Sequence, residues 1–130
     1  VAVLDGTIDV VVSDHTAVNA DAKHLPVGQT QAGAVGVQWL LNSLLHLASE
    51  EKTDIAQVLS SCVANAYAVL ALDTPKWEVG SKANIVVFDT EQYQKIDVSH
   101  ISGKHLNTPW LGYELAGAIQ TVIYQGKAIH

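Results

Sequence analysis

A run of β-branched residues near the start of the chain limits the possible folds more than any other feature. Residues 7 to 13 read TIDVVVS, with apolar side chains on both alternating faces. A strand of this kind is buried on both sides, as in a parallel sheet covered by helices. The run therefore predicts an α/β fold. It places Asp14 at the carboxyl end of a strand, where α/β barrels build their active sites.

A long loop and three helices are predicted after this strand. Residues 15–34 lack periodicity, and loops of this length are often functional. Apolar residues spaced three and four apart predict a helix over residues 35–49. A second helix is predicted with Thr53 as its N-cap and Asp54 in its first turn. A third is predicted over residues 63–72, before a proline.

The last part of the chain is predicted to be rich in strands. Residues 84–89 and 118–129 are short β-type runs, and Gln125 with Gly126 predicts a tight turn inside the second. Residues 90–117, which hold glycines and a proline, are predicted to be mostly irregular surface structure. The change of character divides the chain into residues 1–72 and residues 73–130.

Composition narrows the class of protein. The chain is 48% hydrophobic and 15% charged, which predicts a globular core. The net charge is −6 with scattered basic residues, so we expect neither nucleic acid nor a membrane surface as a partner. A lone cysteine, Cys62, fits a reducing, cytoplasmic setting. Because the chain starts at Val1 and has no methionine, we expect it to be a piece of a longer polypeptide.

Asp14 is the first candidate for chemistry, with two interpretations. A carboxylate at a strand end can ligate a metal or act as a general base. It can equally cap its loop by accepting hydrogen bonds from backbone amides. His15 is interpreted as a loop-packing residue, because neighbouring side chains of an extended backbone point apart. His100 and His105 are five residues apart, which does not match the spacing of a two-histidine zinc clamp.

Glycines and tryptophans are given structural interpretations. Gly33 and Gly36 precede the first predicted helix, where close packing of the backbone is the expected reason for them. Trp39, Trp77 and Trp110 lie far apart in the sequence and are expected to pack a core or an interface.

Several stretches together resemble one family. They are LDGTIDVVVSDH (4–15), GAVGVQWLLNSLL (33–45), VANAYAVLAL (63–72), VGSKANIVVFD (79–89) and NTPWLGYELAGAIQTVIYQGKAI (107–129). In this order they resemble the C-terminal third of a dihydroorotase, a member of the amidohydrolase superfamily. The resemblance implies the C-terminal part of a zinc-dependent (β/α)8 barrel, with residues 7–14 as its last strand. It also implies a share of a small β-sandwich assembled from both chain ends.

The resemblance assigns roles to individual positions. Asp14 matches the aspartate that ligates the metal and shuttles a proton, and the other metal ligands would lie upstream of Val1. Val18 stands where active members have a histidine that helps to hold the substrate carboxylate. Gln31 and Gly33 lie in the substrate loop, of which only the glycine is kept. Gln38 replaces a glutamate that is common at the helix start.

These departures leave three interpretations open. The first is a degenerate, non-catalytic subunit that supports assembly of aspartate transcarbamoylase as part of an oligomer, and the loop DAKHLPVG (21–28) resembles that subgroup. The second is an active zinc enzyme that interconverts carbamoyl aspartate and dihydroorotate, or acts on a related small cyclic amide. The third is a fragment with no activity of its own.

Overall fold

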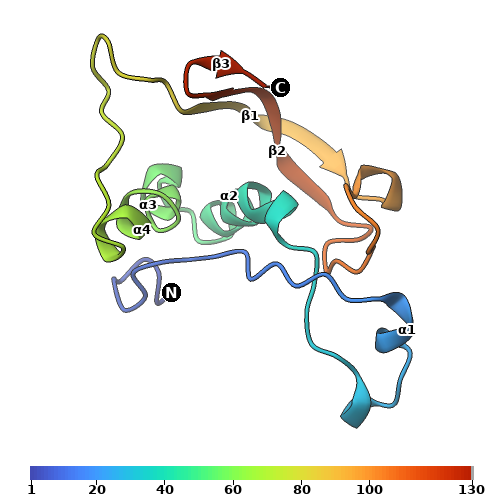
Figure 1. Ribbon diagram of the computed structural model, residues 1–130. Coiled ribbons are helices and arrows are strands. Elements are labelled where there is room, and N and C mark those ends of the chain that lie inside the picture. Colours follow the sequence, from blue (N-terminus) through green and yellow to red (C-terminus); the bar gives the residue numbers. More distant parts are fainter. Residues whose placement is uncertain (130) are drawn as a thin grey trace.

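A computed structural model describes residues 1–129, which form short helices and one antiparallel sheet (Figure 1). The helices are α1 (Ala20–Lys23), α2 (Leu40–Glu50), α3 (Ile55–Ser60) and α4 (Ala64–Val69). The strands are β1 (Ile85–Lys95), β2 (Glu114–Tyr124) and β3 (Lys127–Ala128), in the sheet order β1-β2-β3. Short 3₁₀ turns cover Val27–Gln29, Val37–Trp39 and Val98–His100. In Figure 1, α2 lies between the sheet and the extended N-terminal segment.

The mixed helix and strand content agrees with the sequence, but the strand predicted over residues 7–13 is not formed. This segment is extended, and the nearest ladder pairing is an isolated parallel bridge between His15 and Ala34. Within residues 1–129 no neighbouring strand lies beside it, so its backbone bonds to helical segments instead. The Val11 amide donates to the Ser61 carbonyl at 3.1 Å. The barrel and the β-sandwich implied by the resemblance stay predictions.

The three predicted helices are present with altered ends. The first continues from the 3₁₀ turn at Val37–Trp39 through α2, as its apolar periodicity indicates. The N-cap of α3 was predicted one residue too early. The Asp54 carboxylate accepts from the Ala56 amide at 2.9 Å, whereas the Thr53 hydroxyl donates to the Gln57 side chain.

The third helix, α4, is shorter than the prediction of residues 63–72, since it spans Ala64–Val69. Its end is followed by Ala71 in the left-handed region, at φ +52°. A residue in that conformation cannot continue a right-handed helix.

The sheet is longer than predicted. β1 and β2 pair antiparallel from Ile85 with Ile123 to Lys95 with Glu114. The prediction that residues 90–117 are mostly irregular is therefore wrong at both ends, because mostly polar residues continue β1 to Lys95 and β2 already begins at Glu114. The predicted turn is confirmed, because Gln125 and Gly126 have φ of +49° and +81° and lead directly into β3. Two positive φ values in a two-residue loop match the twist of a hairpin.

Two apolar clusters hold the chain together. One contains Leu44, Ala48 and Val58 and packs α2 against α3 and the N-terminal segment. The other contains five buried residues from both halves of the chain: Val35, Trp39, Ile96, Ile101 and Leu115. The second cluster joins the start of α2 to the sheet and its connecting loop. The division into residues 1–72 and 73–130 stays a prediction.

A buried polar contact fixes α2 on the sheet. The Asn42 amide nitrogen donates to the carbonyl oxygens of Ala116 and Gly117, at 2.7 and 3.0 Å. Gly117 has φ +106°, and a Cβ atom added there would collide with Leu45 Cδ1. The helix therefore approaches the strand at a point where only glycine fits.

No helix within residues 1–129 has the length and apolar character needed to span a membrane.

We expect Gly117→Ala to destabilise the protein through this close approach. Gly80→Ala is the matched control, because Gly80 also has a positive φ, +93°, but open space around its Cα. Both variants carry backbone strain, while only Gly117→Ala also overpacks the interface between α2 and β2. Its free energy of unfolding in urea should fall by about 2 kcal/mol more than that of the control. Equal losses in the two variants would contradict this account of the packing.

Candidate functional site

Residues 13–18 and 33–37 lie side by side and form the corner around Asp14. The Thr16 amide donates to the Ala34 carbonyl at 3.0 Å, next to the bridge between His15 and Ala34. The His15 Nδ1 atom accepts from the amides of Gly36 and Val37, at 3.2 and 3.4 Å. His15 thus satisfies free amides at the start of the helical segment. This confirms its interpretation as a loop-packing residue.

Two glycines allow the two segments to approach this closely. A Cβ atom at Gly33 would lie 2.7 Å from the Thr16 carbonyl oxygen and 2.8 Å from Val18 Cγ2. A Cβ atom at Gly36 would lie 2.6 Å from the Ser13 carbonyl oxygen. The expected close packing at the helix start is therefore confirmed, and its partner is the segment that carries Asp14.

Asp14 is exposed and adopts a left-handed conformation, with φ +41°. Aspartate tolerates this region better than most residues. Its carbonyl oxygen accepts weakly from the Thr16 hydroxyl at 3.4 Å. Within residues 1–129, no hydrogen bond uses its carboxylate. The carboxylate therefore does not cap the loop by accepting from backbone amides, as one of the two interpretations predicts. The carboxylate stands free at the end of the extended segment.

Asp14 fits the role of a single metal ligand but not of a complete site. A zinc ion in a protein takes about four ligands, usually His, Cys, Asp or Glu. Residues 1–129 contain no group of three or more such side chains that could hold a metal. A zinc centre that includes Asp14 would therefore take its remaining ligands from outside these residues.

Val18 and Gln31 occupy very different surroundings. Val18 is only 6% exposed and lies against Gly33. Gln31 is exposed, and its backbone binds the loop: its amide donates to the Ala22 carbonyl, and its carbonyl accepts from Lys23 Nζ at 2.7 Å. The structure therefore places Val18 and Gly33 together in the corner, beside the segment that ends at Asp14. Gln31 belongs to the outer loop around α1.

Asn107 is a residue of this corner that sequence reasoning missed. Its side-chain Nδ2 donates to the Gly33 carbonyl at 2.9 Å, and its main-chain carbonyl accepts from the Val35 amide at 2.7 Å. Residues 33–35 are thus held on one side by the Asp14 segment and on the other by Asn107. The only signal for it in the sequence was its place at the start of the NTPW stretch.

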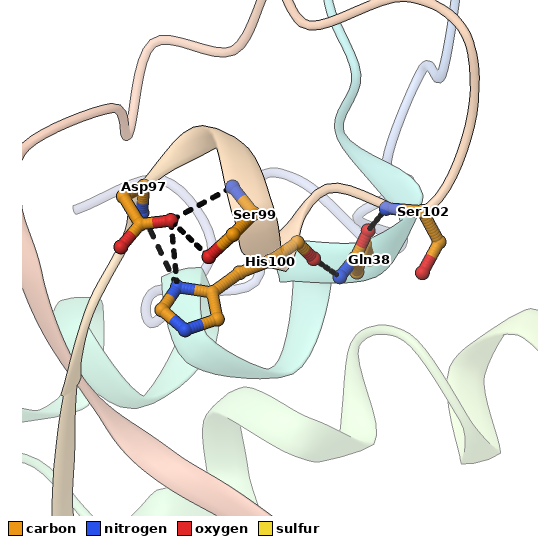
Figure 2. Close-up of polar contacts among 5 residues, drawn as sticks. All are labelled: Gln38, Asp97, Ser99, His100 and Ser102. Carbon is orange, nitrogen blue, oxygen red and sulfur yellow. Dashed lines mark hydrogen bonds and ion pairs between the residues drawn. The ribbon is translucent and has the colours of Figure 1, made fainter.

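Gln38 makes a second link from the helix start to the C-terminal half (Figure 2). Its Nε2 donates to the His100 carbonyl, while its Oε1 accepts from the Ser102 amide at 2.9 Å. The side chain therefore uses a donor and an acceptor at once. A glutamate, which the resemblance places here, has no donor when it is ionised.

The loop that Gln38 holds is closed by Asp97 and His100, whose side chains face one another in Figure 2. The Asp97 amide donates to His100 Nδ1 at 3.3 Å, and the Asp97 carboxylate accepts from the Ser99 hydroxyl and amide. The hydrogen bond from the Ser99 hydroxyl is the main cause that lowers the pKa of Asp97. This carboxylate stays ionised and keeps the turn closed.

Comparison with known proteins shows what the chain is similar to. No family model matches the chain. It is 30% identical over 129 residues to a dihydroorotase of Geobacter metallireducens, covering 99% of this chain and 30% of that protein. It is also 30% identical over 126 residues to a dihydroorotase of Anaplasma phagocytophilum, covering 97% of this chain and 28% of that protein.

Solved structures with a similar fold include D-hydantoinases. The chain superimposes on a D-hydantoinase from Thermus sp. with a TM-score of 0.80 and 25% identity, covering 98% of this chain and 29% of that one. A D-hydantoinase from Bacillus sp. AR9 gives a TM-score of 0.82 at 22% identity, covering 98% and 30%. The chain is similar over nearly its whole length to dihydroorotases, and in fold to D-hydantoinases, which supports a place among the amidohydrolases. It spans about 30% of the length of the relatives it matches.

We expect Gln38→Glu to destabilise the protein at neutral pH, because an ionised carboxylate would face the His100 carbonyl. The loss in free energy of unfolding should be about 1–3 kcal/mol. The same contact raises the pKa of the introduced carboxyl in the folded state. The variant therefore regains stability as pH falls through that raised pKa, and the loss is gone below about 4.3, the unfolded value.

Urea denaturation at several pH values measures this effect. Gln29→Glu is the control, because Gln29 is exposed and its side chain makes no hydrogen bond within residues 1–129. A Gln38→Glu variant that matches the control at every pH would show that the donor of Gln38 is unimportant.

Proposed function

We propose that the chain belongs to a dihydroorotase-like protein without catalytic activity, which supports the assembly of aspartate transcarbamoylase. The burial of Val18 carries the proposal. Its side chain is packed against Gly33, at the position where the resemblance has a histidine that holds the substrate carboxylate. A carboxylate is bound through charged or polar hydrogen-bond donors, and an aliphatic side chain offers none.

The surroundings of Val18 support this proposal. The corner keeps the elements that build it: the two glycines, the amide pairing of Thr16 with Ala34, and the capping by His15. A scaffold that survives while its substrate-binding position becomes part of an apolar contact is typical of a protein selected for assembly. The free Asp14 carboxylate is then a remnant of the ancestral site.

The outer loop is the surface that we assign to the partner. Residues 21–28 carry the sequence that resembles the non-catalytic subgroup, and Val27 in this loop is 96% exposed. Leu25, two residues earlier, is also exposed. Apolar side chains held outward by a folded loop are suited to contact with another protein.

A second candidate function is an active zinc amidohydrolase, and Asp14 favours it. An exposed carboxylate that makes no hydrogen bond within residues 1–129 is free to ligate a metal and to accept the proton of a metal-bound water. Bound zinc would lower the pKa of that water and polarise the cyclic amide. This chain would contribute Asp14, and other parts of the protein would supply the rest of the ligands.

One preparation of the full-length protein tests both candidates. We expect it to show no cyclisation of carbamoyl aspartate with added zinc, at the same background rate as Asp14→Ala. We also expect it to co-elute with aspartate transcarbamoylase in size-exclusion chromatography. Turnover that Asp14→Ala abolishes would overturn the proposal and establish the second candidate.

The outer loop has a matched control in the same chromatography. Val27→Asp should lose co-elution, because it places a charge on the exposed apolar position. Val79→Asp should keep it, because Val79 is equally exposed but lies in the segment before β1. Loss of co-elution in both variants, or in neither, would contradict the assignment of the loop.

A further inference from the structure

Residues 73–82 form a linker between α4 and β1, drawn in Figure 1 as a long connection without helix or strand. Every residue of the linker is exposed, and Trp77, its largest side chain, is 86% exposed. Its backbone hydrogen bond from the Ser81 amide to the Glu78 carbonyl closes a turn inside the linker itself. Within residues 1–129, no hydrogen bond ties the linker to another part of the chain.

One peptide bond of the linker is suited to proteolysis. A protease binds its substrate as an extended chain, so several residues must be free on both sides of the bond that is cut. The Lys76–Trp77 bond lies in the middle of the linker and meets this condition. The Lys82–Ala83 bond lies at its end, where the Ala83 carbonyl accepts from the Gly126 amide at 2.9 Å. The chain beyond Lys82 is therefore fixed on the sheet.

The other lysines are less suited to such a cut. Lys104 lies in a short loop whose ends are fixed, because the Ser102 amide donates to Gln38 and the Asn107 carbonyl accepts from the Val35 amide. The remaining lysines lie in helices, strands or a tight turn: Lys23, Lys52, Lys95 and Lys127. A protease that recognises lysine should therefore distinguish the linker from the rest of residues 1–129.

A cut in the linker would leave the contacts between its two sides intact. The buried cluster around Trp39 and Leu115 takes residues from both sides. Asn42 donates to two carbonyl oxygens of β2, and Gln38 bonds the loop after β1. None of these contacts passes through the linker. The two parts should therefore remain one folded unit without a covalent connection.

We propose that the Lys76–Trp77 bond is a processing site for a protease that cuts after lysine, and that the cut protein keeps its fold. Hydrolysis adds one water molecule across the bond, which leaves a carboxylate on Lys76 and an amine on Trp77. The new charged ends lie in solvent, because both residues are exposed. The site uses no residue of the Asp14 corner, so it stands independently of the proposed function.

Limited trypsin digestion of the native full-length protein tests the site. Among the lysines of residues 1–129, we expect the first cut after Lys76, which N-terminal sequencing identifies as a fragment that begins at Trp77. Lys76→Gln should lose this fragment. Lys82→Gln is the matched control at the fixed end of the linker and should keep it. An uncut linker, or a first cut after another of these lysines, would overturn the site.

Size-exclusion chromatography of the cut protein tests whether its fold is kept. The fragment that begins at Trp77 should co-elute with the rest of the protein in buffer and separate from it in urea. Asn42→Ala should release the fragment at a lower urea concentration, because it removes a contact that spans the cut. Gln29→Ala, an exposed control, should release it as the parent protein does. Release of the fragment in buffer without urea would overturn the claim that the two parts remain one unit.

Discussion

The close approach of two backbone segments, at Gly33 and Gly36, is the constraint on which the rest of the structure depends. Neither position has room for a Cβ atom, because carbonyl oxygens of Thr16 and Ser13 occupy that space. The approach brings the Thr16 amide to its partner and lets His15 cap the start of the helical segment. It also buries Val18. The shape of the candidate site thus follows from contacts between main chains.

The C-terminal half completes this corner from the other side. Asn107 binds the chain at Gly33 and Val35, and Gln38 binds the loop at His100 and Ser102. Both contacts border the apolar cluster around Trp39 and Leu115. Residues that are 62 to 74 positions away in the sequence therefore share one core with the helix start. This arrangement explains why Gln38 uses both the donor and the acceptor of its side chain, whereas Asn107 uses its side-chain donor and its main-chain carbonyl.

Local patterns predicted part of this structure. Apolar periodicity located α2, the turn residues Gln125 and Gly126 located the hairpin, and the glycine spacing indicated close packing at the helix start. These features depend on neighbours in the sequence, so the sequence reveals them. The family resemblance was also visible in short motifs, and the comparisons with dihydroorotases and hydantoinases agree with it.

Features that depend on distant partners were missed or wrong. The β-branched run at residues 7–13 is extended but unpaired, because a strand needs a neighbour that residues 1–129 do not supply. β1 continues after Asp89 because residues 93–95 pair with β2, while the Asp89 carboxylate accepts from the amides of Glu91 and Gln92 in the irregular stretch between. The roles of Asn107 and Gln38 could not be predicted, because an amide side chain gives no periodic signal. Val18 looked like a position facing a ligand, and only the structure shows its burial.

Native-state amide hydrogen exchange tests the central claim, that residues 13–18 and 33–37 form one cooperative unit. The reporters are the amides of Thr16, Val35, Gly36 and Val37, which bond across the two segments or to Asn107. If the account is right, all four share one free energy of opening, and Asn107→Ala lowers it for all of them together. Protection of Thr16 that persists while Gly36 and Val37 exchange as in an unfolded chain would contradict it.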